Sequence, residues 1–268
     1  MASGQKILRL KATLLGIKPP IWRRLEVPAE LSLHGLHACL QAAFGWTDSH
    51  LHEFEVDGQT YAPPDSESGM AHLDSRDQPL AELEGKVKAF GYNYDFGDDW
   101  HHTIEIEAWF KMEEGVKYPR CTAGARACPP EDCGGDYGYL ELIAALRDSR
   151  HERHQELKEW VGPRFDTEAF DLQLANAALK RVKMPSPKPG LLMRAVAKPG
   201  KPKLDSKDKA VLLASMRTEF KSAGAAMTPD LEKALLGFVE VRLNRMAAGK
   251  KSPTRKATRS AVGKQGRG

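Results

Sequence analysis

Histidines and acids gather around two stretches of this 268-residue chain that could carry chemistry. Two of the histidines form a His-x-His pair, and a third lies about fifty residues later, beside several aspartates. Imidazole and carboxylate groups suit zinc, manganese or iron, so this pattern indicates a divalent-metal site. The candidate ligands are His50, His52 and His102, and the candidate cleft residues around them are Asp95, Asp98, Trp100, Glu131 and Asp132.

Strand parity predicts that these histidines point inward. Side chains two positions apart on a strand share a face, so His50 and His52 should lie with Phe54 and Val56. By the same rule His102 lies with Trp100 and Ile104. We therefore expect His52 and His102 to face one cleft, with Glu131 or Asp132 in or near the ligand shell.

A structural interpretation of the same residues stays open. His52 and His102 would then be core histidines hydrogen-bonded to nearby acids. Asp98 and Asp99 would serve a turn, and Trp100 would belong to the core. The sequence does not fix the distance between the two strands, so it does not choose between the two interpretations.

Three cysteines offer a second, weaker site. Cys121, Cys128 and Cys133 lack the CxxC spacing typical of structural zinc, although His151 or His154 could complete such a set. Buried free thiols are the alternative. The chain has neither a G-x-S-x-G elbow nor a P-loop, so nucleophilic catalysis and nucleotide binding have no motif behind them.

The elements that position these residues follow from hydrophobic spacing. Residues 7–14 and 19–28 predict two strands with charged, solvent-facing sides, and residues 32–46 predict a helix capped by Ser32. Period-two alternation around Asp57 predicts a hairpin, and residues 92–106 predict another. A further helix follows Gly134, with Asp136 as its cap. These elements indicate an α+β domain with a mostly antiparallel sheet and packed helices.

Charge divides the chain near residue 180. Residues 1–179 hold 18 Lys and Arg against 30 Asp and Glu, whereas residues 180–268 hold 22 against 6. We predict a domain at 5–180, a basic linker at 181–203, a helical hairpin at 204–248 and a disordered basic tail at 249–268. No long apolar run or signal-peptide pattern appears, so we expect no membrane association and a cytoplasmic location.

The first domain resembles the plasmid pRiA4b ORF-3-like family, which includes passenger proteins of mobile elements sometimes labelled TnpR. This resemblance covers residues 5–180. It implies an α+β domain and a mobile-element association, and it carries no established reaction. The segments that carry it are "GIKPPIWRRLEVP", "FGWTDSHLHEFEV", "YNYDFGDDWHHTIEIE", "CTAGARACPPEDCGGDYGYLELIAAL" and "FDTEAFDLQLANAAL".

Two function classes follow. The first, which we favour, is an accessory or binding module that contacts nucleic acid through its tail, or that meets a protein partner or a second copy through the hairpin. The second is a metal-dependent enzyme that uses the His/Asp cleft. Without acids, the tail could neutralise phosphates nonspecifically, and its candidate residues are Lys250, Lys251, Arg255, Lys256, Arg259, Lys264 and Arg267.

Overall fold

One mixed sheet forms the centre of the molecule. The computed structural model describes residues 5–64, 72–183 and 229. Within them the strand order is β5-β4-β3-β6-β7-β1-β2-β8, and every pairing except that of β4 with β5 is antiparallel. The strands are β1 (Lys6–Leu14), β2 (Ile21–Pro28), β3 (His52–Val56), β4 (Gln59–Ala62), β5 (Leu73–Asp74), β6 (Ala89–Tyr94), β7 (Trp100–Lys111) and β8 (Arg120–Ala125).

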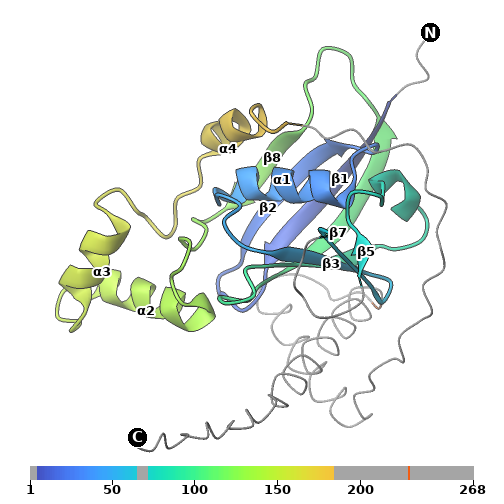
Figure 1. Cartoon of the computed structure of the whole chain (residues 1–268). Coiled ribbons are helices and arrows are strands. Elements are labelled where there is room, and N and C mark those ends of the chain that lie inside the picture. The colour runs from blue at the N-terminus through green and yellow to red at the C-terminus, as the bar shows by residue number, and fades with distance from the viewer. Residues whose placement is uncertain (1–4, 65–71, 184–228, 230–268) are drawn as a thin grey trace, which may run out of the picture.

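Helix α1 covers one face of this sheet (Figure 1). It begins where the Ser32 hydroxyl accepts a hydrogen bond from the Gly35 N–H, and it ends at Gly45, whose φ of 90° is readily available to glycine. Its buried side packs Leu36, Leu40 and Phe44 into the core. The helices are α1 (Leu33–Phe44), the 3-10 turn η1 (Leu80–Leu83), α2 (Gly135–Arg147), α3 (His154–Val161) and α4 (Leu172–Leu179).

The two predicted hairpins are present. Asp57 and Gly58, with φ of 48° and 74°, join β3 to β4, which is the backbone that an Asp-Gly turn favours. The turn from Asp95 to Asp99 joins β6 to β7, and both terminal aspartates again have positive φ. Positive φ is uncommon for residues other than glycine, and Asp tolerates it better than most.

Two details differ from the expectations. Gly134, rather than Asp136, is the N-cap of α2, and Asp136 lies in the first helical turn, with its carboxylate against Gly16. Glycine takes the cap because the chain enters the helix with a φ of 90°. The charged sides of β1 and β2 are only partly exposed, because Glu26 on β2 is buried, at 1% exposed.

The α+β class and the mostly antiparallel sheet predicted from the sequence are confirmed. Apart from residues 181–183, the predicted linker lies outside the described residues. The predicted tail with its seven basic residues also lies outside them, as does the predicted hairpin apart from residue 229. In the described part of the chain, no helix is both long enough and apolar enough to cross a membrane.

Candidate metal centre

His50 belongs to a pinned loop between α1 and β3. Trp46 anchors this loop because its ring is buried and its Nε1 donates to the Pro129 carbonyl at 3.0 Å. Asp48 has a φ of 57°, and its N–H donates to the Gln41 side chain at 2.9 Å. These contacts fix the loop on both sides, so the direction of the His50 side chain is set by packing.

Asp95 directly follows β6, and its two carboxylate oxygens have different partners. Its Oδ1 accepts hydrogen bonds from the backbone N–H groups of Gly97 at 2.9 Å and Asp98 at 3.2 Å. This Asx-type turn holds the side chain, which is almost fully buried. Its Oδ2 is left facing His50 Nε2 at 3.5 Å.

Glu131 arrives from the segment that precedes α2. Its Oε1 accepts from the Thr47 N–H at 2.8 Å and from the Tyr94 hydroxyl at 3.0 Å. The Tyr94 hydroxyl in turn accepts from the Ser49 N–H at 3.1 Å. Burial, followed by the Glu131 carboxylate, raises the pKa of the Tyr94 phenol, so the phenol remains a donor at neutral pH.

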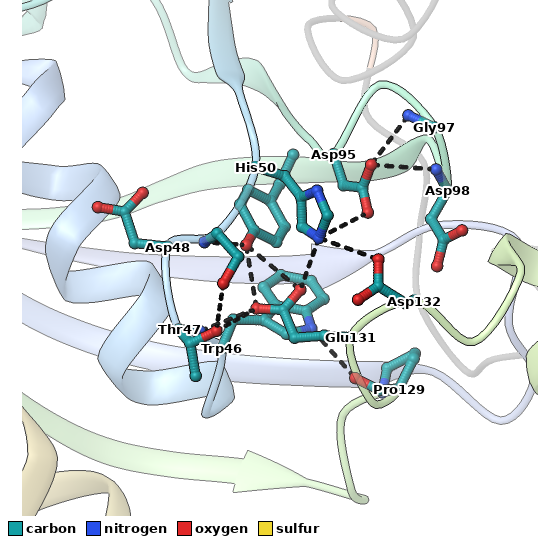
Figure 2. Close-up of polar contacts among 12 residues, drawn as sticks. Trp46, Thr47, Asp48, His50, Asp95, Gly97, Asp98, Pro129, Glu131 and Asp132 are labelled. Carbon is teal, nitrogen blue, oxygen red and sulfur yellow. Dashed lines mark hydrogen bonds and ion pairs between the residues drawn. The ribbon is translucent and has the colours of Figure 1, made fainter.

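The three side chains converge on one point (Figure 2). His50 Nε2 lies 3.5 Å from Asp95 Oδ2 and 3.8 Å from Glu131 Oε2, and the ligand atoms of all three lie within 4.8 Å of one another. With metal–ligand bonds of about 2.1 Å, neighbouring ligands of a tetrahedral ion lie about 3.4 Å apart. The separations from the imidazole therefore match a metal coordination shell.

The environment of His50 Nε2 is unusual for a polar atom. It is buried, yet it makes no hydrogen bond in the described part of the chain. Asp132 Oδ1 approaches it to 3.2 Å, but this carboxylate is 74% exposed and does not join the mutually close set. A buried imidazole nitrogen without a hydrogen bond carries a free-energy cost that a bound cation would remove.

Two of the predicted cleft residues have other positions. Asp98 Oδ2 accepts from the Gly134 N–H at 3.2 Å, so its carboxylate fastens the start of α2 to the β6–β7 turn. Trp100 is fully buried in the core, where its ring stacks near Trp46. Neither side chain belongs to the group of ligand atoms around His50.

His52 is separated from His50, although the two are nearly adjacent in sequence. Strand β3 starts only at His52, so the parity argument does not extend back to His50 in the loop. The His52 ring is 3% exposed and stacks on His37, with centroids 3.4 Å apart and planes 6° apart. Burial, followed by the charges of His37 and His34, lowers the pKa of His52 to about 2.

His102 also faces inward without meeting the acids. Its ring packs edge-on against Phe44 and Trp46, and Nδ1 lies 3.1 Å from the Trp100 carbonyl. Burial, followed by the charge of His101, lowers the pKa of His102 to about 3. The structure places His52 against His37, and His102 against Phe44 and Trp46, and neither imidazole belongs to the group of ligand atoms around His50.

A second set of potential ligands is formed by His37, Asp48 and His52. A metal ion lies in the plane of each imidazole that binds it. The stacked planes of His37 and His52 are nearly parallel, so one ion cannot lie in both. His37 instead bonds Asp48 through Nε2 at 2.7 Å and the Tyr92 hydroxyl through Nδ1 at 2.8 Å. This set is a packing and hydrogen-bonding cluster.

The cysteines form no comparable group among the described residues. All four are free thiols, and the Cys121 Sγ donates to the Ala123 carbonyl. Burial raises the pKa of the Cys133 thiol to about 12. His154 Nδ1 lies 2.7 Å from the Ala145 carbonyl, so this ring is engaged elsewhere.

Sequence reasoning missed Tyr94 and Thr47, which hold Glu131 in place. Tyr94 alternates with Tyr92 on an inward strand face, where an apolar role is the ordinary expectation. An open groove of about 300 Å³ adjoins Glu131. It is lined by Phe44, Gly45, Trp46, Cys128, Pro129, Pro130, Glu131, Trp160, Val161 and Phe165.

The chain is similar to proteins whose activities are themselves unassigned. It is 42% identical over 176 residues to the uncharacterized protein y4hQ of Sinorhizobium fredii, covering 65% of this chain and 90% of that protein. A crystal structure of the protein of unknown function MM3350 from Methanosarcina mazei Go1 superimposes with a TM-score of 0.59 and 36% identity. That match covers 64% of this chain and 98% of the other. The profile of the plasmid pRiA4b ORF-3-like proteins matches residues 6–174, so the chain belongs to this family.

Proposed function

We propose that this domain is a metal-binding module that holds one divalent ion through His50 Nε2, Asp95 Oδ2 and Glu131 Oε2. The observation that carries the proposal is the buried His50 Nε2, which makes no hydrogen bond while two well-held carboxylates face it at 3.5 and 3.8 Å. The other oxygen of each carboxylate, Asp95 Oδ1 and Glu131 Oε1, accepts a hydrogen bond from a backbone N–H group. The ligand set is therefore largely preorganised before an ion binds.

The ligand chemistry favours zinc, manganese or iron. One imidazole with two carboxylates is a mixed nitrogen and oxygen set, whereas calcium and magnesium prefer oxygen alone. Three protein ligands leave at least one coordination position open. Asp132, largely exposed and 3.2 Å from His50 Nε2, borders that position. An ion held here would have room to bind a water molecule or an anionic group from solution.

A zinc titration of the metal-free full chain tests this proposal. We expect one equivalent of zinc to bind, and His50→Ala to weaken binding by at least about tenfold. Asp95→Asn is the sharper variant, because Asn keeps an oxygen for the Asx turn and tolerates positive φ while it loses the charge. It should weaken binding to a similar extent.

Asp98→Asn is the matched control, since this neighbouring carboxylate in the same turn points to Gly134 rather than to His50. Its zinc affinity should equal that of the parent chain. The proposal fails if zinc, manganese and ferrous iron all fail to bind with a defined stoichiometry. It also fails if His50→Ala and Asp98→Asn have the same affinity.

A further inference from the structure

The groove of about 300 Å³ beside Glu131 is formed by segments that are far apart in sequence. They are the end of α1, the residues shortly before α2 and the end of α3. Such a volume lies at the lower end of the range for ligand pockets. The size of the groove therefore favours a small molecule over a folded protein partner.

Aromatic side chains form much of the groove. The rings of Phe44 and Trp46 stack with centroids 5.4 Å apart and planes 20° apart. The hydrogen bond from Trp46 Nε1 to the Pro129 carbonyl fixes this pair in place. Trp160, at the end of α3, also lines the groove, and it is 50% exposed although it is a large apolar side chain. Half of this indole is therefore accessible to a ligand in the groove.

One carboxylate supplies the charge of the groove. Glu131 is 19% exposed, and no lysine or arginine is among the described residues that line the groove with it. Burial raises the pKa of the Cys128 thiol, so this second titratable lining group is uncharged at neutral pH. Asp95 and Asp132 approach His50 as Glu131 does, and they add negative charge at this end. The metal-free groove therefore complements a cation.

The aromatic and acidic lining together favour a quaternary ammonium group. The faces of aromatic rings attract cations, and tryptophan does so most strongly. An ammonium or guanidinium group brings three to five N–H donors that need acceptors, whereas a quaternary ammonium group brings none. Its methyl groups can pack directly against the rings. We propose that the groove binds a small quaternary ammonium molecule, with the cationic group between Trp160 and Glu131.

A titration of the metal-free full chain with choline tests this proposal. Choline carries a trimethylammonium group, and dimethylbutanol, in which carbon replaces the nitrogen, is its neutral analogue. The indole N–H signals in NMR spectra locate the binding, once Trp160→Phe and Trp22→Phe have assigned two of them. We expect choline to shift the Trp160 signal and not that of Trp22, which lies on β2 outside the groove. Choline should bind at least about tenfold more tightly than dimethylbutanol.

Variants of the two groups that would hold the cation sharpen the test. Trp160→Ala should weaken choline binding by at least about tenfold, and Trp160→Phe should weaken it less because a ring remains. Glu131→Gln keeps the size of the side chain and removes its charge, so it should also weaken binding. Leu174→Ala is the matched control, because it removes an exposed apolar side chain that does not line the groove. Its choline affinity should equal that of the parent chain.

The result is independent of the proposed metal centre, because the titration contains no metal ion. Asp95→Asn removes a proposed metal ligand outside the groove, so it should weaken choline binding less than Glu131→Gln does. Three outcomes would overturn the proposal. They are no choline binding, equal affinities for choline and dimethylbutanol, and an unchanged choline affinity in Trp160→Ala.

Discussion

The phenol of Tyr94 donates a hydrogen bond to Glu131 across 3.0 Å, joining a buried strand to the segment that precedes α2. This bond determines how Glu131 presents its other oxygen to His50. The same phenol accepts from the Ser49 N–H, next to His50 in sequence. The Tyr94 side chain thus orients both Glu131 and the loop that carries His50, two of the three proposed metal ligands.

Replacing Tyr94 should therefore weaken metal binding without removing a ligand. In Tyr94→Phe, Glu131 keeps its bonds to Thr47 but loses its most buried donor. Removing groups that orient metal ligands commonly costs tenfold or more in affinity, so we expect zinc affinity to fall by about tenfold. Isothermal titration measures it. Tyr137→Phe, at an 89% exposed position, should leave affinity unchanged, and an equal loss in both variants would contradict this role for Tyr94.

Gly135 couples the start of α2 to the β6–β7 turn. Its φ is 67°, and an added Cβ would lie 2.7 Å from the Asp98 carbonyl oxygen. Gly135→Ala should lower the free energy of unfolding by about 1–3 kcal/mol, since both the backbone conformation and the contact disfavour a side chain. Denaturant unfolding measures the loss. Gly162→Ala also has positive φ but meets no atom within 4 Å, so its smaller loss would report the backbone cost alone.

The elements were predictable because each has a local cause. Ser32, Gly45 and the Asp57-Gly58 pair act through their own backbone geometry, and alternation marks the strands. The grouping of the site residues was less accessible. His50 meets Asp95 and Glu131 because a loop, a turn and the approach to α2 come together, and no periodic pattern extends across those three segments.

The prediction from strand parity that His50 shares a face with His52 failed because His50 lies in a loop. The alternation argument holds only inside a strand, and the boundary of β3 falls between His50 and His52. The sequence therefore could not distinguish His50, which faces Asp95 and Glu131, from His52 and His102, which lie in the core. Alternation within a strand also does not report how deeply a polar side chain is buried, since Glu53 on β3 and Asn93 on β6 are 4% and 0% exposed.

Arg23 and Arg24 are adjacent, yet they should contribute very differently to the free energy of unfolding. Arg23 is buried between Phe44 and Phe170 and donates to the carbonyls of Trp22, Ala43, Ala125 and Arg126. Lysine lacks the planar fork that reaches several acceptors, so Arg23→Lys should cost about 3 kcal/mol of unfolding free energy. Arg24 pairs with Glu107 near the surface, and Arg24→Lys should cost less than about 1 kcal/mol. Denaturant midpoints of the two variants make the comparison, and similar losses would contradict the assignment of Arg23 to the core.

His102 should make the stability of this domain depend on pH. Burial lowers its folded pKa to about 3, whereas an unfolded histidine titrates near 6.5. Below about pH 6.5 the unfolded chain therefore binds a proton that the folded chain refuses, and stability falls as the pH falls toward 3. Between pH 7 and 5.5 the titration of this single ring should lower the free energy of unfolding by about 1 kcal/mol.

His102→Leu removes the titrating group, so its loss of unfolding free energy over that pH interval should be smaller by about this amount. Ile104→Val, on the same strand and face, should lower stability at both pH values and keep the parent's pH dependence. Denaturant unfolding at the two pH values measures both differences, and an unchanged pH dependence in His102→Leu would show that this imidazole is not held neutral by the core.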